Sequence, residues 1–559
     1  MKQIDIIKTY AQKRCLVVDD LPDARAQLKR ILIDFGANEI DTAANAQDAI
    51  DCCGKHQYDI VIADYNLGAG KSGQQLLEEL RFHRLLRNTA LFVMVTAENA
   101  AHYVLHTLEY EPDDFFNKPI SRESLRPRLD QALLKNEYLR KIKLALDDHD
   151  LNRATLQAEK LKDEAHRFQN DVRKLLAELY LKSGRAEDTL ALCSEYPDDK
   201  RPLWVDLAKA RALYQLKNFD EAETLLRNIA QSNAYCVEAH DLLAQIYEES
   251  HRPLQSQHAL LNAVKISPRH APRQRELGRV SNKIDDHNSS VHAYRSAIRH
   301  SKNSCHESAS DLLNLALNLN QLSTKVDKAQ AHALQEEARQ NLDAAEKKYG
   351  KHPLVKMRRL LIESDLLAAQ NKPDEAEAQT RKAINLHESM RTSVIGNSDA
   401  QLSIDCALAF INRGRYDEGE SILQALAKQN SDHELAIKID RLLREPQTRE
   451  GIAFAAKLNK SGIELYEQGK LEAAVGYFRQ VLQEIPNHIG LNLNLIQALS
   501  SKAKRLPLNR AEIELLRSCF KRIGDLSNKD SYRDRYEFLL RRFEKIVEDF
   551  ERRQTEAET

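Results

Sequence analysis

Apolar residues are distributed in two different ways along the chain, and the change falls near residue 135. Before it, five short and nearly continuous apolar runs alternate with segments whose apolar residues recur at helical spacing. The runs are RCLVVDD, NEIDTAA, YDIVIADY, ALFVMVTA and DDFFNKP. Such runs, each followed by a helical segment, indicate parallel strands that helices bury on both faces. Residues 1–135 are therefore predicted to form a doubly wound α/β domain with a five-stranded parallel sheet.

After residue 135 the strand-like runs stop and the helical spacing continues. A self-similarity with a period of about 34 residues emerges, because Leu243 then falls on Leu277 and Ala263 on Ala297. Small residues at such steps let the two helices of a hairpin approach closely. The clearest unit is NKSGIELYEQGKLEAAVGYFRQVLQEIPNH, and the pattern resembles the tetratricopeptide repeat. The resemblance implies an all-α superhelical solenoid whose concave groove binds a peptide or helix.

The composition restricts the class of partner. Lys and Arg number 83 and Asp and Glu 84, which gives a formal charge of −1 and no indication of a nucleic-acid or membrane surface. The eight cysteines include no CxxC pair and no His–Cys cluster at zinc-ligand spacing, which indicates free thiols in a reducing cytoplasm. No apolar stretch has the length of a membrane span, and no helix-turn-helix module stands apart. A cytoplasmic protein without membrane or DNA contacts is predicted.

Polar residues fall at the ends of the predicted strands. Asp19 and Asp20 end the first run, Asp64 the third and Thr96 the fourth, and Lys118 ends the fifth. The carboxyl ends of parallel strands meet at one edge of a sheet. Three converging carboxylates repel one another unless a hard cation such as Mg²⁺ neutralises them. A carboxylate in such a site can attack a phosphoryl donor, and a hydroxyl and an ammonium can then hold the phosphoryl oxygens.

Each of these residues taken alone has an ordinary structural interpretation. The Asp19–Asp20 pair is typical of turns and helix caps, Thr96 of a β-strand, and Lys118 of a solvated surface. The functional interpretation is favoured because all five fall at strand ends in the expected order.

The segment GAGKSG after Asp64 raises the possibility of a phosphate-binding loop of the Walker type. That loop requires a glycine five positions before the glycine of Gly-Lys-Ser, and Tyr65 stands there. The segment instead predicts a flexible turn with Ser72 near a helix start.

With these positions filled, residues from about 12 to 135 resemble the receiver domain of two-component response regulators. The resemblance implies that Asp64 is the phosphoacceptor. It implies that Asp19, Asp20 and Asp64, with the backbone carbonyl of Asn66, hold Mg²⁺. It also implies that Thr96 and Lys118 bind the phosphoryl oxygens.

The resemblance extends to positions that modulate the family's switch. Phe115 occupies the place of an aromatic residue that turns inward on activation. Asn66 and Glu98 match positions that tune the lifetime of the acyl phosphate. The bond between Lys118 and Pro119 is implied to be cis.

The chain is expected to divide into five segments. They are a receiver domain at 1–135, a helical linker or first hairpin at 136–168, tetratricopeptide repeats at 169–301, degenerate helical repeats at 302–445, and a last repeat with capping helices at 446–559. The pattern from Ser121 to about Leu146 predicts one continuous helix, with its start displaced or its axis kinked by Pro127.

These features predict a response regulator of a two-component phosphorelay. A sensor histidine kinase or phosphotransfer protein would phosphorylate Asp64 and thereby control a repeat scaffold that binds another protein. No enzymatic output is expected beyond the receiver's own phosphorylation and dephosphorylation. Two alternatives stay open: an unphosphorylated receiver that forms a homodimer on a constitutive adaptor, and helical repeats that bind RNA.

Overall fold

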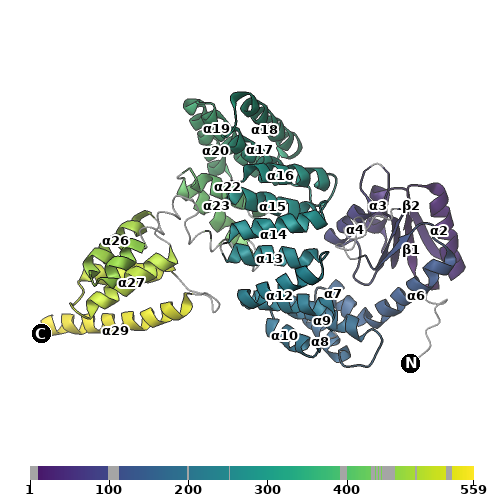
Figure 1. Cartoon of the computed structure of the whole chain (residues 1–559), viewed down its shortest axis with the longest axis horizontal. Helices are drawn as coiled ribbons and strands as arrows, with labels where there is room; N and C mark the ends of the chain where they lie inside the picture. Colours follow the sequence, from purple (N-terminus) through teal and green to yellow (C-terminus); the bar gives the residue numbers. More distant parts are fainter. Residues whose placement is uncertain are drawn as a thin grey trace. The chain divides into compact units, whose positions relative to one another are not determined.

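The computed structural model of the protein describes residues 10–68, 70–97, 112–197, 201–250, 252–390, 400–413, 415–429, 460–484, 488–523 and 532–558, together with 435, 439 and 442. The chain divides into two compact units, Met1–Ala338 and Arg339–Thr559. The first unit contains an α/β domain followed by helical hairpins, and the described part of the second is helical (Figure 1).

Five parallel strands form the sheet of the first domain, in the order β2-β1-β3-β4-β5. They are β1 (Arg14–Val18), β2 (Glu39–Ala43), β3 (Ile60–Asp64), β4 (Leu91–Thr96) and β5 (Asp114–Asn117). Asp64 pairs with Val95 and Thr96 with Asn117, so the carboxyl ends of the three strands lie at one edge. The predicted five-stranded parallel sheet is confirmed.

Helices cover both faces of this sheet. The helices α2 (Pro22–Phe35) and α6 (Arg122–Tyr138) pack on one face, and α3 (Ala46–Lys55) and α4 (Gly73–Phe82) pack on the other. Successive strand residues point to opposite faces, so Ile62 joins the first core and its neighbour Ala63 joins the second. Because both faces are covered, the three central strands β1, β3 and β4 are apolar almost throughout.

The predicted continuous helix from Ser121 to Leu146 is wrong in one respect. Ser121 caps the start of α6 by accepting the Ser124 amide, and Pro127 is accommodated within that helix without displacing its start. The chain then breaks at Leu139 before α7 (Arg140–Asp147). Leu139 keeps helical backbone angles and is buried in the core that the first hairpins build.

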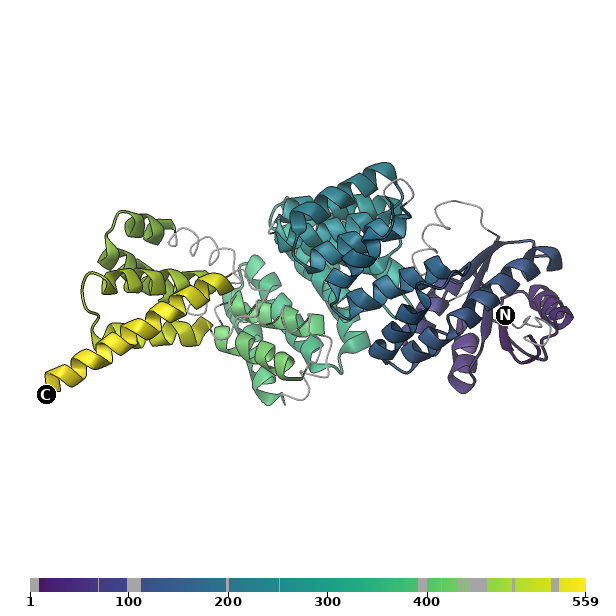
Figure 2. The same ribbon diagram turned by 90° about the horizontal axis from the view of Figure 1, so that it is seen from below.

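The helices after α7 form hairpins with a regular period. After α8 (Leu151–Leu161) come α9 (Gln169–Lys182) with α10 (Ala186–Ser194), α11 (Leu203–Gln215) with α12 (Phe219–Ser232), α13 (Val237–Glu249) with α14 (Pro253–Ile266), and α15 (Ala271–Lys283) with α16 (His287–Ser301). The helices that start at Leu203, Val237 and Ala271 recur every 34 residues or so, the period found in the sequence. Figures 1 and 2 agree in showing these hairpins stacked on one another, with α17 (Ala309–Ser323) following.

Close helix contacts explain the small residues of the repeat pattern. A β-carbon on Gly278 would lie 2.8 Å from the ring of Tyr294, and one on Gly462 would overlap the ring of Phe478. The ring follows the glycine at the same sequence distance in both hairpins. At the tight turns Gly184 and Asn371 have φ angles of 70° and 57°, the left-handed conformation that their positions predict.

The boundary between the two units falls within α18 (Lys328–Tyr349). The second unit continues with α19 (Pro353–Ala369), α20 (Pro373–Ser389), α22 (Ala400–Ile411), α23 (Tyr416–Gln429), α26 (Leu471–Glu484), α27 (Ile489–Ala503), α28 (Arg510–Ile523) and α29 (Arg533–Glu558). The last four helices share one apolar core, in which Phe478, Leu495 and Leu516 are buried. None of the described helices combines the length and apolar character that a membrane span requires.

Candidate functional site

Three carboxylates meet at the carboxyl edge of the sheet. Asp64 is the last residue of β3, and Asp19 and Asp20 directly follow β1. One oxygen atom from each of the three side chains lies within 4.8 Å of the others. Asp19 and Asp64 are buried, whereas Asp20 is exposed to solvent. The three residues predicted from strand ends are therefore brought together.

Lys118, just past the end of β5, joins two of these carboxylates. Its Nζ donates to Oδ2 of Asp19 at 2.8 Å and to Oδ2 of Asp64 at 2.7 Å. Burial of the ammonium alone would lower its pKa, but these two bonds outweigh burial and the pKa of Lys118 is raised. Its backbone amide donates to the carbonyl of Thr96, and the bond from Lys118 to Pro119 is cis, as predicted.

The electrostatic balance at Asp64 disfavours a lone negative charge. Burial raises the pKa of Asp64, and the bond from Lys118 offsets this effect only in part. The nearby charge of Asp19 raises the pKa further. A second positive charge would therefore stabilise the ionised carboxylate, and an all-oxygen donor set of three carboxylates is the kind that Mg²⁺ prefers. The residues present fit such an ion.

The other predicted site residues occupy neighbouring positions. Thr96 is the buried last residue of β4. Asn66 lies two residues past Asp64, and its side-chain oxygen accepts the Gly68 amide. Phe115 is half-buried and packs against the core shared by α3 and α4. Glu98 lies outside the described residues.

Helix α4 begins directly beside the acid cluster. Ser72 caps it by accepting the amide of Gln75, and the Gly73 amide donates to the carbonyl of Tyr65 at 2.8 Å. A β-carbon on Gly73 would overlap the carbonyl oxygen of Asp64. The predicted helix start near Ser72 is confirmed, but the importance of Gly73 was missed. The only signal was a glycine at the first position of a predicted helix, where many residue types are tolerated.

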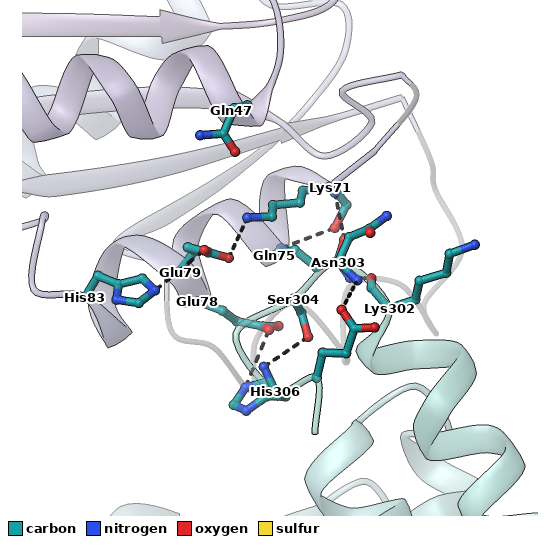
Figure 3. A network of polar contacts seen from close by, with 12 residues as sticks. Gln47, Lys71, Gln75, Glu78, Glu79, His83, Lys302, Asn303, Ser304 and His306 are labelled. Atoms are coloured by element: carbon teal, nitrogen blue, oxygen red, sulfur yellow. Dashed lines mark hydrogen bonds and ion pairs between the residues drawn. The ribbon is translucent and has the colours of Figure 1, made fainter. Parts of the chain in front are cut away.

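Helix α4 of the α/β domain also contacts the loop between α16 and α17 (Figure 3). Gln75 Nε2 donates to the carbonyl of Lys302 at 3.3 Å across 227 positions of sequence. Glu78 Oε2 lies 3.5 Å from His306 Nε2. Sequence patterns could not indicate these contacts, because each partner belongs to a different domain.

A second set of contacts joins the loop before β4 to the end of α7. The Asp147 carboxylate accepts the Asn88 amide at 2.6 Å, the Asn88 side-chain amide at 2.8 Å and the Thr89 hydroxyl at 3.1 Å. Within the first unit the α/β domain is thus bonded to the helical hairpins both through α4 and through the loop before β4.

Known proteins resemble the first domain. The family model of the response regulator receiver domain matches residues 15–130. The chain is 27% identical over 118 residues to the chemotaxis protein CheY-3 of Vibrio cholerae, which covers 21% of this chain and 89% of that protein. It is 28% identical over 140 residues to the transcriptional regulatory protein LytR of Staphylococcus aureus, which covers 25% of this chain and 51% of that protein.

A solved receiver domain protein (CheY-like) from Methanospirillum hungatei is 26% identical, with a TM-score of 0.21, and the match covers 22% of this chain and 97% of that one. The family match together with the sheet topology establishes the amino-terminal domain as a CheY-like receiver domain. The match to the family ends at residue 130, before the helical hairpins begin.

Proposed function

Because the amino-terminal domain is the receiver domain of a two-component response regulator, we propose that the protein is a phosphorylation-controlled scaffold with Asp64 as phosphoacceptor. One observation carries this proposal: a single ammonium, that of Lys118, is bonded to both Asp19 and Asp64 within a cluster of three carboxylates. Such a cluster is poorly suited to a purely structural role, since it concentrates negative charge in a buried place. It is well suited to nucleophilic attack on phosphorus.

In the proposed reaction a carboxylate oxygen of Asp64 attacks the phosphorus of a phosphohistidine on a sensor kinase or phosphotransfer protein. The phosphorus–nitrogen bond breaks and its electron pair remains on the imidazole. Asp19, Asp20, Asp64 and the backbone carbonyl of Asn66 would hold Mg²⁺, and the bound ion would supply positive charge that offsets the carboxylates and the phosphoryl oxygens.

Two further groups of this chain act on the phosphoryl group. The Lys118 ammonium transfers its hydrogen bond from the Asp64 carboxylate to a phosphoryl oxygen, and the Thr96 hydroxyl donates to another. Glu98 is proposed to influence the access of the hydrolytic water. The receiver performs no other chemistry in this proposal.

The output is proposed to be a tetratricopeptide-type scaffold in the cytoplasm that binds a protein or peptide. Its support is the run of hairpins whose helices recur every 34 residues or so with close glycine–aromatic contacts. Balanced charge, with 83 basic and 84 acidic residues, favours a protein ligand over RNA, because RNA binding relies on excess positive charge.

Helix α4 is the proposed connection between the two parts. It starts against the backbone of Asp64 and presents Gln75 to the carbonyl of Lys302. Phe115 packs against the core that includes Leu76 and Leu80 of the same helix. Phosphorylation that rearranges the loop after Asp64, or repacking of Phe115, would therefore shift α4 on the array.

The test is the intact mass of the full chain after incubation with acetyl phosphate and Mg²⁺. We expect one added phosphoryl group on the wild type and none on Asp64→Asn or after removal of the cation by a chelator. The matched control is Asp59→Asn, because Asp59 precedes the same strand at its opposite end and binds Lys13 there. This control should be phosphorylated normally. An adduct that persists in Asp64→Asn would contradict the assignment of the acceptor.

A further inference from the structure

A second cluster of ligand-type side chains lies where the receiver domain meets the helical array. Glu78 extends from α4, and Cys305 and His306 belong to the loop between α16 and α17. One carboxylate oxygen, the thiol sulfur and one imidazole nitrogen all lie within 4.8 Å of one another. Figure 3 shows Glu78 and His306 facing each other across the two domains. Carboxylate, thiol and imidazole together form a donor set typical of zinc.

The distance between the Glu78 carboxylate and the His306 imidazole fits two ligands of one metal ion better than a direct hydrogen bond. Glu78 Oε2 and His306 Nε2 are 3.5 Å apart. A good N–H···O bond measures about 2.7–3.2 Å. Two ligands of a tetrahedral Zn²⁺, each bonded at about 2.0–2.2 Å, lie about 3.3–3.5 Å apart. The two atoms therefore already stand at the separation that one ion imposes.

The loop is held in place by its own hydrogen bonds. The Ser304 hydroxyl accepts the His306 amide at 3.2 Å and donates to the Ser301 carbonyl at 2.8 Å. Arg275 donates to the His306 carbonyl at 2.8 Å. On the receiver side, Gln74 donates to Oε1 of Glu78 at 2.8 Å, which directs the other oxygen towards His306. Fixed ligands of this kind lower the ordering cost of binding a metal.

The local charges favour a cation. The carboxylates of Glu78 and Glu79 both act on the Cys305 thiol. A cation would offset this negative environment and stabilise the thiolate. The nearby ammonium of Lys71 is already paired with Glu79 at 2.8 Å.

We propose that Glu78, Cys305 and His306 form a site for one Zn²⁺ ion that joins α4 of the receiver to the α16–α17 loop. Three protein ligands leave a fourth, exchangeable position for water. The site differs from the acid cluster around Asp64, whose oxygen donors suit Mg²⁺. The bound ion would hold α4 against the array and so oppose any displacement of that helix. The sequence spacing of the ligand residues did not indicate this site, because they come from two domains.

The test uses the full chain stripped of metal by a chelator and titrated with Co²⁺, a spectroscopic substitute for Zn²⁺, in excess Mg²⁺. We expect one equivalent to bind and to produce both visible ligand-field bands and a near-ultraviolet thiolate-to-cobalt charge-transfer band. Cys305→Ser should abolish the charge-transfer band. Glu78→Gln and His306→Gln should each weaken Zn²⁺ affinity, measured by calorimetry, by at least about tenfold.

Cys52→Ser is the matched control, because Cys52 is another partly buried thiol and lies on the receiver helix α3. It should keep both the band and the affinity. Circular dichroism establishes that each variant is folded before it is titrated. A charge-transfer band that survives Cys305→Ser, a loss of binding in Cys52→Ser, or the absence of any binding to the wild type would overturn the proposal.

Discussion

The carbonyl oxygen of Asp64 occupies the space that a β-carbon on Gly73 would need. Asp64 ends β3 and Gly73 begins α4, so the two elements meet without an intervening side chain. The same helix contacts the α16–α17 loop through Gln75 and Glu78. The proposed acceptor and the helical array are thus connected by a single short helix.

This close contact predicts that Gly73→Ala destabilises the protein. The new methyl group must displace the backbone of β3, which costs about 1–3 kcal/mol by the usual effect of overpacking. The control is Gly54→Ala in α3, where the added β-carbon meets nothing within 4 Å. The free energy of unfolding of that variant should rise by about 0.5–1 kcal/mol, because alanine has a higher helix propensity than glycine. Urea unfolding of the full chain measures both, and equal effects of the two substitutions would refute this explanation.

Removing the Lys118 ammonium should leave Asp19 and Asp64 buried without their cation. We expect Lys118→Met to lower the free energy of unfolding at neutral pH by about 1–3 kcal/mol without divalent cations. Added Mg²⁺ should recover much of this loss, because the ion offsets the same carboxylates.

The control for this effect is Lys13→Met. Its side chain is 24% exposed, against 23% for Lys118, and forms a single ion pair with Asp59. The free energy of unfolding should decrease less in Lys13→Met than in Lys118→Met, and added Mg²⁺ should not recover it. If the two variants lost the same free energy of unfolding and responded equally to Mg²⁺, Lys118 would not stabilise the carboxylates of the acid cluster.

Because the pKa of Asp64 is raised, ionisation of this carboxyl should lower the free energy of unfolding as the pH rises. The Asp64 carboxyl group holds its proton more tightly in the native state than in the unfolded chain, where an aspartate titrates at about pH 4. Stability contributed by the protonated form is therefore lost as pH rises from that value through the native pKa. Without Mg²⁺, Asp64→Asn should be more stable than the wild type at pH 7, and the difference should shrink as the pH is lowered towards 4.

Asp41→Asn should change the stability at neutral pH in the opposite direction. Burial alone would raise the pKa of Asp41, but bonds from Tyr58 and Arg14 outweigh it and the pKa is lowered. Asp41→Asn should therefore be less stable than the wild type at neutral pH, with a deficit that shrinks on acidification. Unfolding curves across this pH range test both variants, and a pH-independent difference for Asp64→Asn would exclude the proposed effect of ionisation.

The contact between Asp147 and the loop before β4 predicts a local effect. Asp147→Ala removes the acceptor of three hydrogen bonds from Asn88 and Thr89. Amide hydrogen exchange at 84–90 should accelerate at least severalfold, because the loop loses its anchor on α7. The adjacent variant Asp148→Ala is the control, since Asp148 pairs with Arg153 within the array. Acceleration of 84–90 in both variants would contradict a specific role for Asp147.

Much of this fold could be predicted because its signals are local. The strands β3 and β4 are apolar up to their last residues, so Asp64 and Thr96 could be placed at strand ends without any tertiary information. The hairpin period was visible because each repeat forms the same contacts with its neighbours. The turn residue Asn371 could be predicted from its own conformational preference.

The remaining features depend on tertiary packing. The interruption at Leu139 falls at a side chain that is buried by helices that follow later in the chain, which local patterns do not reveal. The meeting of Glu78 with His306 joins residues from separate domains, and neither residue belongs to a recognisable motif. Gly73 is required by the backbone of another element and not by its own helix.

In the proposed function, the state of Asp64 controls the contact between α4 and the helical array. The most direct measurement is hydrogen–deuterium exchange of the full chain with and without Mg²⁺ and beryllofluoride, a stable mimic of the phosphoryl group, in the wild type and in Asp64→Asn. We predict faster exchange at 302–308 on addition of the mimic in the wild type, and no change in the variant. Unchanged exchange at 302–308 in a wild type that has bound the mimic would show that Asp64 does not control this contact.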